Sequence, residues 1–410
     1  MTGTLAEAGT QAGTQAATET WDAVVVGGGP AGATAAMDLA RNGRSVLLLD
    51  RAGRIKPCGG AIPPVCVKEF AIPDSQVVAR VTGARIVAPS AKEADMPITG
   101  GPGGYVGMVD REGFDEYLRV RAADAGAARR TGTFERVGRD ADGTAVVHYA
   151  TPDGPGQVRA RAVIGADGAK SQVAKQCVKG WERVRYVFAY HEIVRAPKDP
   201  AAFDSSRCDV YYQGALSPDF YAWIFPHGDT MSIGTGSARK GFGLRPAITA
   251  LRKSTGLDGL ETVRREGAPI PLRPMRRWDN GRDVVLAGDA AGVVAPASGE
   301  GIYYAMLGGR LAAEAVEALH ATGDVRSLKL ARKRFMKAHG TVFLVLGIMQ
   351  RFWYSSDKRR EKFVHMCRDP DVQRMTWEGY MHKKLVRRDP MAHVRIFLKD
   401  TAQLLGLARA

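Results

Sequence analysis

Residues 24–32 read Val-Val-Val-Gly-Gly-Gly-Pro-Ala-Gly, a short apolar run that leads into a glycine-rich turn. Gly27, Gly29 and Gly32 have GxGxxG spacing, and the Ala-rich stretch that follows is typical of a helix. The first glycine allows the tight turn, the second lets backbone approach a pyrophosphate, and the third packs the helix against the strand. A second apolar run ends in Asp50, whose carboxylate can bind a ribose. This order of elements predicts a dinucleotide site.

Two later segments, 161–171 and 284–301, favour FAD over NAD as the dinucleotide. Each is an apolar, strand-like run followed by a turn that contains Gly and Asp. A single Rossmann unit needs no such distant partners, whereas a cofactor stretched across a sheet does. The alternative is two ordinary strand–turn–helix units. The candidate cofactor-binding residues in these segments are Asp167, Gly168, Gly288, Asp289, Pro296, Gly299 and Gly301.

Together, the three segments resemble the glutathione-reductase-type flavoproteins of the aromatic-hydroxylase and geranylgeranyl-reductase group. The resemblance implies that Asp289 binds the ribityl chain and that the backbone amides of Gly299 to Gly301 face the pyrimidine end of the flavin. A helix N-terminus at that point would stabilise negative charge on the reduced ring. On the same basis we expect a further set of residues to bind FAD: Arg51, Cys58, Gly59, Gly60 and Arg111.

Two further segments narrow the resemblance. Residues 56–64, Lys-Pro-Cys-Gly-Gly-Ala-Ile-Pro-Pro, predict a stiff loop with one flexible point, suited to lie against a flat ring. Residues 217–226, Ser-Pro-Asp-Phe-Tyr-Ala-Trp-Ile-Phe-Pro, fit the pattern PxxYxWxFP. Both resemble the geranylgeranyl reductases of chlorophyll and bacteriochlorophyll biosynthesis, and the similarity covers nearly the whole chain after residue 20.

Cys58 is a candidate catalytic residue within that loop. If the loop lies beside the flavin, the Cys58 thiol can position or protonate an alkene. Water or a tyrosine can supply the proton instead. A cysteine considered by itself is most often a small buried hydrophobe.

The aromatic segment predicts the other catalytic candidates. On an extended strand, Tyr221, Trp223 and Phe225 share one face, whereas Phe220, Ala222 and Ile224 share the other. A row of three rings can line an apolar groove for a polyprenyl chain. The rings can also stabilise a tertiary carbocation during protonation of an alkene. The alternative is that the strand simply packs a core.

The family resemblance implies an activity and a fold. The activity is FAD-dependent reduction of three of the four double bonds of a geranylgeranyl chain to give phytyl, on geranylgeranyl diphosphate or a bacteriochlorophyllide ester. NADPH is the implied transient electron donor, but the sequence has one GxGxxG and no second Rossmann unit, so we assign no residue to it. The alternatives are a flavin monooxygenase of the same fold, a flavoprotein that binds RNA, and an assembly factor with a structural flavin.

The expected fold class is α/β, with a glutathione-reductase-type FAD-binding Rossmann domain, an antiparallel β substrate domain and a helical C-terminal region. Residues 131–139, 144–150 and 157–164 predict a small β-meander across the main sheet, and 111–124 predict an amphipathic helix. The expected boundaries are a disordered lead-in at 1–20, an FAD domain at 21–70, 108–173 and 282–322, a substrate domain at 71–107 and 174–281, and a basic helical region at 323–410.

Composition limits the remaining alternatives. The chain has 410 residues, 45% of them hydrophobic and 25% charged, which is typical of a globular protein of two or three domains. No apolar stretch reaches the roughly 20 residues that span a bilayer, and the N-terminus does not resemble a secretory signal. Five cysteines favour a reducing cytoplasm, and Cys58 and Cys66 lack companions for a metal site. We therefore expect no metal.

The net charge of +15 is concentrated near the C-terminus, where residues 326–410 contain 20 Lys and Arg against 7 Asp and Glu. The charge fits a solvated helical appendage. It also fits a surface for anionic lipid. Together with the family resemblance, such a surface implies peripheral association with the photosynthetic or cytoplasmic membrane and contact with pigment-synthesis enzymes. We expect no nucleic acid partner, because no nucleic-acid motif accompanies the charge. The runs in question are 332–334, 358–360, Lys383-Lys384 and Arg387-Arg388.

Overall fold

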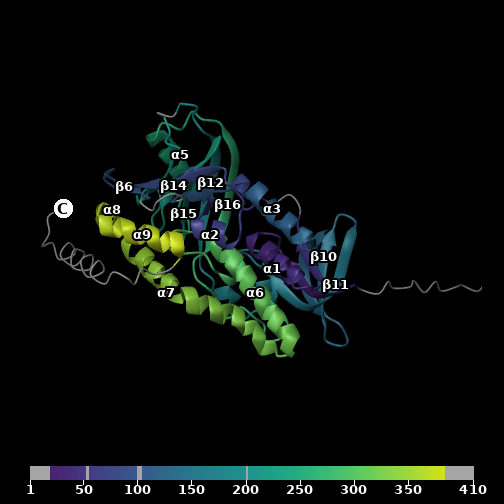
Figure 1. The fold of residues 1–410 in the computed structure, drawn as a ribbon. Coiled ribbons are helices and arrows are strands. Elements are labelled where there is room, and N and C mark those ends of the chain that lie inside the picture. The colour runs from purple at the N-terminus through teal and green to yellow at the C-terminus, as the bar shows by residue number, and fades with distance from the viewer. Residues whose placement is uncertain (1–18, 52–54, 99–103, 200–201, 384–410) are drawn as a thin grey trace, which may run out of the picture.

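The computed structural model describes residues 19–51, 55–98, 104–199 and 202–383. Residues 1–18 of the expected lead-in and the basic residues after Lys383 lie outside these ranges. The described chain forms three sheets and a run of C-terminal helices (Figure 1).

The first sheet has seven strands in the order β8-β2-β1-β11-β10-β9, with β17 beside β11. Five of them run parallel, as a dinucleotide-binding sheet requires, and β9 and β10 are antiparallel. The apolar runs of β1 and β2 are almost fully buried, which is typical of a parallel sheet with both faces covered. The strands are β1 (Thr20–Val26), β2 (Val46–Asp50), β8 (Ala128–Thr131), β9 (Thr133–Arg139), β10 (Ala145–Thr151), β11 (Gly154–Gly165) and β17 (Val284–Leu286).

The expected meander is present as β9, β10 and β11, but it is not a separate layer. β11 pairs with β10 along its first part and continues between β1 and β17. The meander is therefore an extension of the first sheet. Two helices flank these strands in the chain. The predicted amphipathic helix α3 (Arg111–Asp124) comes before β8, and α4 (Gln172–Cys177) follows β11.

Two helices from distant parts of the sequence lie side by side on the first sheet (Figure 1). They are α1 (Pro30–Arg41) and α6 (Ile302–Thr322). A Cβ on Gly309 would lie 2.1 Å from the carbonyl oxygen of Ala31, so only glycine allows this close approach of the two backbones. The contact fixes the start of α6 relative to the glycine-rich turn before α1.

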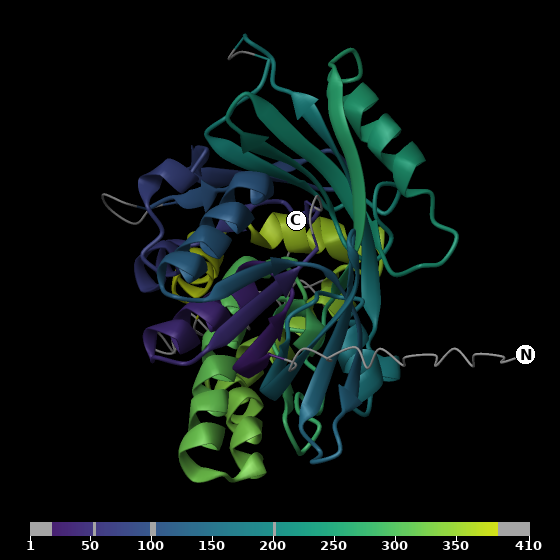
Figure 2. The same cartoon turned by 90° about the vertical axis from the view of Figure 1, so that its right-hand side faces the viewer.

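The second sheet has the order β16-β12-β15-β14-β13-β5-β6. All its neighbouring pairs are antiparallel except β13 and β5, which run parallel. Figure 2 shows this sheet as a curved layer, with α5 (Leu244–Ser254) on its outer face. Its strands are β5 (Gly83–Val87), β6 (Glu93–Pro97), β12 (Tyr186–Arg195), β13 (Arg207–Tyr211), β14 (Ala222–His227), β15 (Thr230–Ser237) and β16 (Thr262–Pro271).

A small third sheet and the C-terminal helices complete the described chain. The third sheet pairs β3 (Ala61–Ile62), β7 (Val106–Met108) and β4 (Ala79–Val81) in that order, and α2 (Pro64–Glu69) follows β3. From α6, the chain turns back along α7 (Lys329–Trp353) and then forms α8 (Asp357–Met366) and α9 (Pro370–His382). α8 contacts β6, and α9 contacts α2. Among the described residues, no helix is long and apolar enough to cross a membrane.

Candidate functional site

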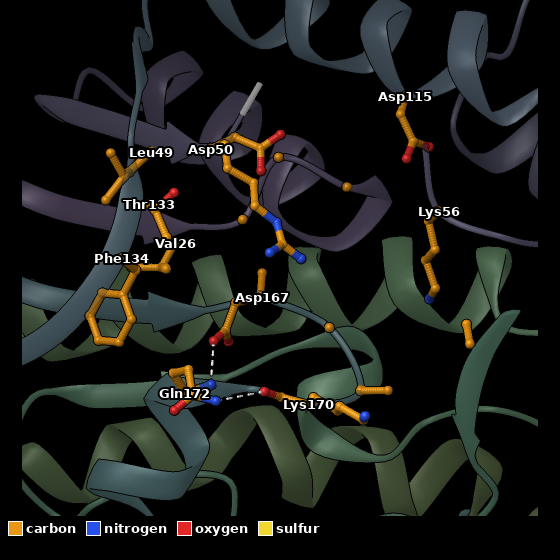
Figure 3. A pocket seen from close by; sticks show the side chains of 18 of the residues that line it. Val26, Leu49, Asp50, Lys56, Asp115, Thr133, Phe134, Asp167, Lys170 and Gln172 are labelled. Carbon is orange, nitrogen blue, oxygen red and sulfur yellow. Dashed lines mark hydrogen bonds between the residues drawn. The ribbon is translucent and has the colours of Figure 1, made fainter. Parts of the chain in front are cut away.

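A cavity of about 470 Å³ lies at the carboxyl ends of β1, β2 and β11 (Figure 3). Gly27 has φ of 104°, and a Cβ there would lie 2.4 Å from the carbonyl oxygen of Ala166. A Cβ on Gly32 would lie 1.8 Å from the carbonyl oxygen of Gly27. At Gly29, the N-cap of α1, a Cβ would meet nothing within 4 Å. The fold thus requires glycine at positions 27 and 32. Gly29, in contrast, opens onto the cavity at the positive end of helix α1.

Asp50 and Arg51 line the same cavity at the end of β2. Burial raises the pKa of the Asp50 carboxyl above its ordinary value. Arg119 of α3, which the sequence analysis missed, lies 3.4 Å from that carboxylate and donates a hydrogen bond to the carbonyl of Gly28 at 3.3 Å. The acid predicted to bind ribose therefore has a neighbouring cation from a distant helix.

Asp167 and Gly168 also border the cavity, but the Asp167 carboxylate is directed at α4. It accepts a hydrogen bond from the amide of Gln172 at 2.6 Å (Figure 3) and another from the amide of Val173 at 3.2 Å. Burial is the main reason that its pKa is raised. Asp167 therefore caps the start of α4, and what this turn presents to the cavity is mainly backbone, including Gly168 with φ of 85°.

Arg111 joins the cavity to the loop of Cys58. Its buried guanidinium binds the Asp115 carboxylate through two hydrogen bonds of 2.8 and 2.7 Å. Burial alone would lower the pKa of Arg111, but the facing Asp115 carboxylate and the Cys58 sulfur raise it above its ordinary value. Cys58 is half-buried, and its sulfur accepts a hydrogen bond from the Gly60 amide at 3.4 Å. The thiol is thus held between a permanent cation and its own loop.

The predicted ribityl ligand, Asp289, is buried and forms an ion pair with Lys56, whose side chain is partly exposed. Lys56 begins the loop quoted from the sequence, yet the sequence analysis assigned it no role there. Gly288 has φ of 63°, and a Cβ on it would lie 2.8 Å from the Cβ of Ala31. A Cβ on Gly301 would lie 3.8 Å from Oδ1 of Asp289. The turn that contains Gly288 and Asp289 therefore packs directly on the glycine-rich turn at the start of α1.

The loop of Pro296, Gly299 and Gly301 lies against the aromatic segment. Gly299 has φ of 66°, and a Cβ on it would lie 3.0 Å from Cζ of Phe220 and 3.4 Å from the hydroxyl of Tyr221. The Tyr221 hydroxyl donates a hydrogen bond to the carbonyl of Ser298. This loop, which precedes α6, is thereby fixed to the second sheet.

The three aromatic candidates form a continuous row. Ring centroids are 5.8 Å apart between Tyr221 and Trp223 and 6.0 Å apart between Trp223 and Phe225. A Cβ on Gly59 would lie 3.1 Å from the ring of Phe225, so the Cys58 loop meets one end of the row. The Gly299 loop meets the other end. The structure therefore brings together three segments that are far apart in the sequence.

One prediction about this row is wrong. Phe220 does not lie on the opposite face from Tyr221, because their rings stack with centroids 4.2 Å apart. The extended strand β14 begins only at Ala222, so the alternation of faces does not apply to the two residues before it. Phe220 is fully buried and extends the aromatic row towards Gly299.

His227, at the end of β14, is another residue that the sequence analysis missed. Its Nδ1 lies 3.2 Å from the carbonyl oxygen of Phe225, and a Cβ on Gly60 would lie 2.5 Å from its Nε2. Burial lowers the pKa of His227 to about 4. The ring is therefore neutral near pH 7 and packs behind the Cys58 loop. The sequence feature that could have identified His227 is its position two residues after Phe225, which places both side chains on the same face of the strand.

The C-terminal helices complete the aromatic end of the site. Tyr354, just after α7, donates a hydrogen bond to the carbonyl of Ala297 at 3.0 Å, and its hydroxyl lies 3.1 Å from that of Tyr212. Arg360 is only 2% exposed, and its guanidinium donates to the carbonyls of Pro218 and Tyr354. These contacts attach α8 to the loop that precedes the aromatic row.

The expectation that the basic runs form a solvated or lipid-facing surface is therefore wrong for two of their members. Arg360 is buried as described, and Lys383 is buried against Glu300. Both side chains have partners inside the protein that the sequence could not reveal. Lys384, Arg387 and Arg388 lie outside the described residues. The described ranges contain no cluster of three or more His, Cys, Asp or Glu side chains able to hold a metal.

Family models and known proteins match most of this chain. A model of the FAD binding domain family matches residues 79–315, and a model of NAD(P)-binding Rossmann-like domains matches 25–90. The geranylgeranyl diphosphate reductase of Rhodobacter capsulatus is 56% identical over 94% of this chain and 98% of its own length. That of Synechocystis is 37% identical over 93% of this chain and 97% of its own.

Two solved structures share the fold. A geranylgeranyl bacteriochlorophyll reductase-like protein from Thermoplasma acidophilum superposes with a TM-score of 0.78 at 23% identity, over 92% of this chain and 96% of its own. The p-nitrophenol 4-monooxygenase of Pseudomonas putida superposes with a TM-score of 0.68 at 18% identity, over 88% and 98%. The predicted fold class is thereby confirmed. The chain belongs to the geranylgeranyl diphosphate reductase family of FAD-binding proteins.

Proposed function

We propose that this chain reduces three double bonds of a geranylgeranyl chain to give phytyl, on geranylgeranyl diphosphate or on a geranylgeranyl-bacteriochlorophyllide. The observation that carries the proposal is the aromatic row, which meets the Cys58 loop at Phe225 and the Gly299 loop at Tyr221. A row of buried rings suits an apolar chain better than a small polar substrate. When bound, FAD supplies the hydride.

The residues of the site suggest a division of roles. Arg51 and Arg111 lie at the cavity that contains the glycine-rich turn, where cations suit a pyrophosphate. The rings of Trp223 and Phe225 can stabilise positive charge that develops on the tertiary carbon. The amides around Gly299 and Gly301 lie at the start of α6, where partial positive charge suits a reduced flavin.

Cys58 is the proposed source of the proton, because the other nearby candidates are less suitable. The Tyr221 hydroxyl is committed to the carbonyl of Ser298, and burial raises its pKa far above the ordinary value. His227, with its pKa lowered to about 4, carries no spare proton near neutral pH. The Cys58 thiol lies against Arg111 and has no such commitment among the described residues.

NADPH is the proposed electron donor and would bind only transiently. The family match to NAD(P)-binding domains falls on residues 25–90, which contain the turn assigned here to FAD. Within the described ranges, one strand–glycine–helix unit of this type occurs, at β1 and α1. A separate nicotinamide site therefore has no residues to which it can be assigned.

We also propose a cytoplasmic location with peripheral attachment to an anionic membrane, close to other enzymes of pigment synthesis. The 25-residue helix α7 contains no acidic residue. Its Leu344 and Ile348 are 63% and 59% exposed, the largest values among the exposed large hydrophobic residues that the structure describes. Exposed Lys333 and Lys337 precede them on the helix. Apolar and basic side chains on one helix suit a lipid surface.

The test is anaerobic turnover. The FAD-loaded protein is incubated with NADPH, or with dithionite, and geranylgeranyl diphosphate, and products are identified by mass spectrometry. We expect successive gains of two hydrogens up to the phytyl product. The alternative function is that of a flavin monooxygenase of the same fold, as the structural similarity to p-nitrophenol 4-monooxygenase suggests. Such an enzyme would instead need oxygen and would form a hydroxylated product. NADPH oxidation without any alkene reduction, with or without oxygen, would contradict the proposal.

A further inference from the structure

A buried ion pair connects the last described residue to the loop at the flavin end of the site. Nζ of Lys383 lies 2.9 Å from Oε2 of Glu300, and each side chain is only 3% exposed. The ammonium also lies 3.9 Å from the ring centroid of Tyr380 and 5.6 Å from that of Tyr304. A buried ion pair costs desolvation, and loss of one partner leaves an uncompensated charge. Such a pair therefore enforces one arrangement of the segments that it joins.

Glu300 lies between the two glycines proposed to face the flavin. Gly299 faces the aromatic row, and Gly301 lies near Asp289. The Glu300 side chain accepts a hydrogen bond from the Tyr303 amide at 2.9 Å through Oε1, while its other oxygen faces Lys383. The loop thus contacts the aromatic row through Gly299, while its Glu300 side chain is held by the end of α9.

The backbone at Lys383 gives an independent indication that its side chain is required. Lys383 is the C-cap of α9 and has φ of 53° and ψ of 32°, in the left-handed region. Glycine is the usual residue at a helix end with this conformation, because a Cβ is unfavourable there. A lysine in this position accepts strain that a glycine would avoid, and its ammonium makes the buried contact in return.

We propose that Lys383 is a positioning residue that holds Glu300, and through it the Gly299–Gly301 backbone, in the conformation that binds FAD. The C-terminal helices thus contribute to the cofactor site without touching it. The inference rests on the proposed placement of the flavin's pyrimidine end at this loop, but it does not depend on which substrate is reduced. Its readouts are FAD release and flavin potential, so failure of the geranylgeranyl assay would leave it standing.

The experiment measures FAD release from the diluted holoprotein by the rise in flavin fluorescence. Lys383→Gly relieves the backbone strain but removes the ammonium, and Lys383→Met keeps the apolar stem. We expect both to release FAD at least about tenfold faster than the wild type, because Glu300 is left buried without its partner. Lys383→Arg should retain most of the affinity. Adding Glu300→Gln to Lys383→Met should restore slower release by removing the unpaired carboxylate.

A matched control separates positioning from general loss of stability. Arg252 pairs with Glu192 at 2.5 Å on the outer face of the second sheet, with side chains 9% and 12% exposed. Arg252→Met should lower the melting temperature but leave FAD release unchanged. Release unchanged in Lys383→Gly and Lys383→Met, or equally accelerated in Arg252→Met, would overturn the proposal.

The midpoint potential of the bound flavin gives a second readout. Lys383→Met leaves a negative charge behind the loop and should lower the potential, whereas Glu300→Gln leaves a positive charge and should raise it. A merely structural loss would move both variants in the same direction. Shifts of the same sign, or no shift in either variant, would also overturn the proposal.

Discussion

The two ends of the site are built in different ways. At the glycine-rich turn, the contacts that shape the cavity are mainly backbone to backbone, as between Gly32 and Gly27 and between Gly27 and Ala166. At the aromatic end, side chains and loops from four distant segments converge: the Cys58 loop, β14, the loop before α6 and the C-terminal helices. Variants at the first end should therefore act through the backbone, and variants at the second through side-chain chemistry.

The largest expected difference is between two glycines of one turn. Gly32→Val should prevent folding, with a cost of about 4 kcal/mol or more, because its Cβ would lie 1.8 Å from a backbone oxygen that cannot move. Gly29→Val should fold, because a Cβ there meets nothing within 4 Å. It should nevertheless lose FAD, since the side chain fills the approach to the pyrophosphate.

Circular dichroism and the flavin absorbance of the purified proteins check both outcomes. A folded Gly29→Val protein that keeps one FAD per chain would show that the phosphates lie elsewhere. A folded Gly32→Val protein would show that the turn is less rigid than described.

Cys58→Ala tests the chemistry of the aromatic end. We expect FAD content close to that of the wild type and a fall in alkene reduction of at least about a hundredfold, as for loss of a general acid. The substitution removes little volume and leaves the contact between Gly59 and Phe225 intact. Product analysis under anaerobic conditions measures the effect. Cys177→Ala, at a half-buried cysteine at the end of α4, is the matched control and should turn over normally.

The contrast between the two ends also explains how far the sequence could predict the site. Gly27, Gly29 and Gly32 could be assigned because their spacing within one turn marks them in the sequence, whatever each of them contacts in the fold. The expected faces of the aromatic segment were right for Tyr221, Trp223 and Phe225 as a row, but wrong for Phe220, because the sequence does not show that the extended strand begins at Ala222. Fold class followed from the order of strands, glycines and helices.

Three of the residues that the sequence analysis missed depend on contacts between distant segments. Lys56 binds Asp289, Arg119 approaches Asp50, and Lys383 binds Glu300. Each is a cation whose partner lies far away in the chain, so no local spacing marks the pair. In the sequence, Lys383 looked like one more member of a solvated basic run. The folded chain shows that the Lys383 side chain is buried, and burial makes it a partner of Glu300 rather than a solvated surface charge.

A smaller effect is expected at His227, from the sign of its pKa shift. Its pKa in the folded protein is about 4, below the ordinary value of 6.5, so the unfolded chain takes up the proton first as pH falls. The contribution of the neutral His227 ring to the free energy of unfolding is fully present above pH 6.5, and it is lost progressively as the pH falls to 4. His227→Gln should recover about 2 kcal/mol of that loss, since the ring is partly exposed and the full shift is not realised. Urea unfolding at pH 7.5 and 4.5 measures it. His382→Gln, at an exposed position, should change neither value.

The smallest effect concerns the exposed surface of α7. Lys337→Glu should weaken binding to anionic vesicles by about 1 kcal/mol at low salt, about fivefold, and the effect should fade as salt screens the charge. Lys240→Glu makes the same change in net charge at an exposed site between β15 and α5 and should leave vesicle binding intact. Co-sedimentation with vesicles of anionic and neutral lipid measures both variants.

Reduction of soluble geranylgeranyl diphosphate should survive in Lys337→Glu, because α7 contributes this side chain to no contact with the site. Equal loss in both variants would mean that net charge alone drives binding, and no loss in either would remove α7 from the membrane surface.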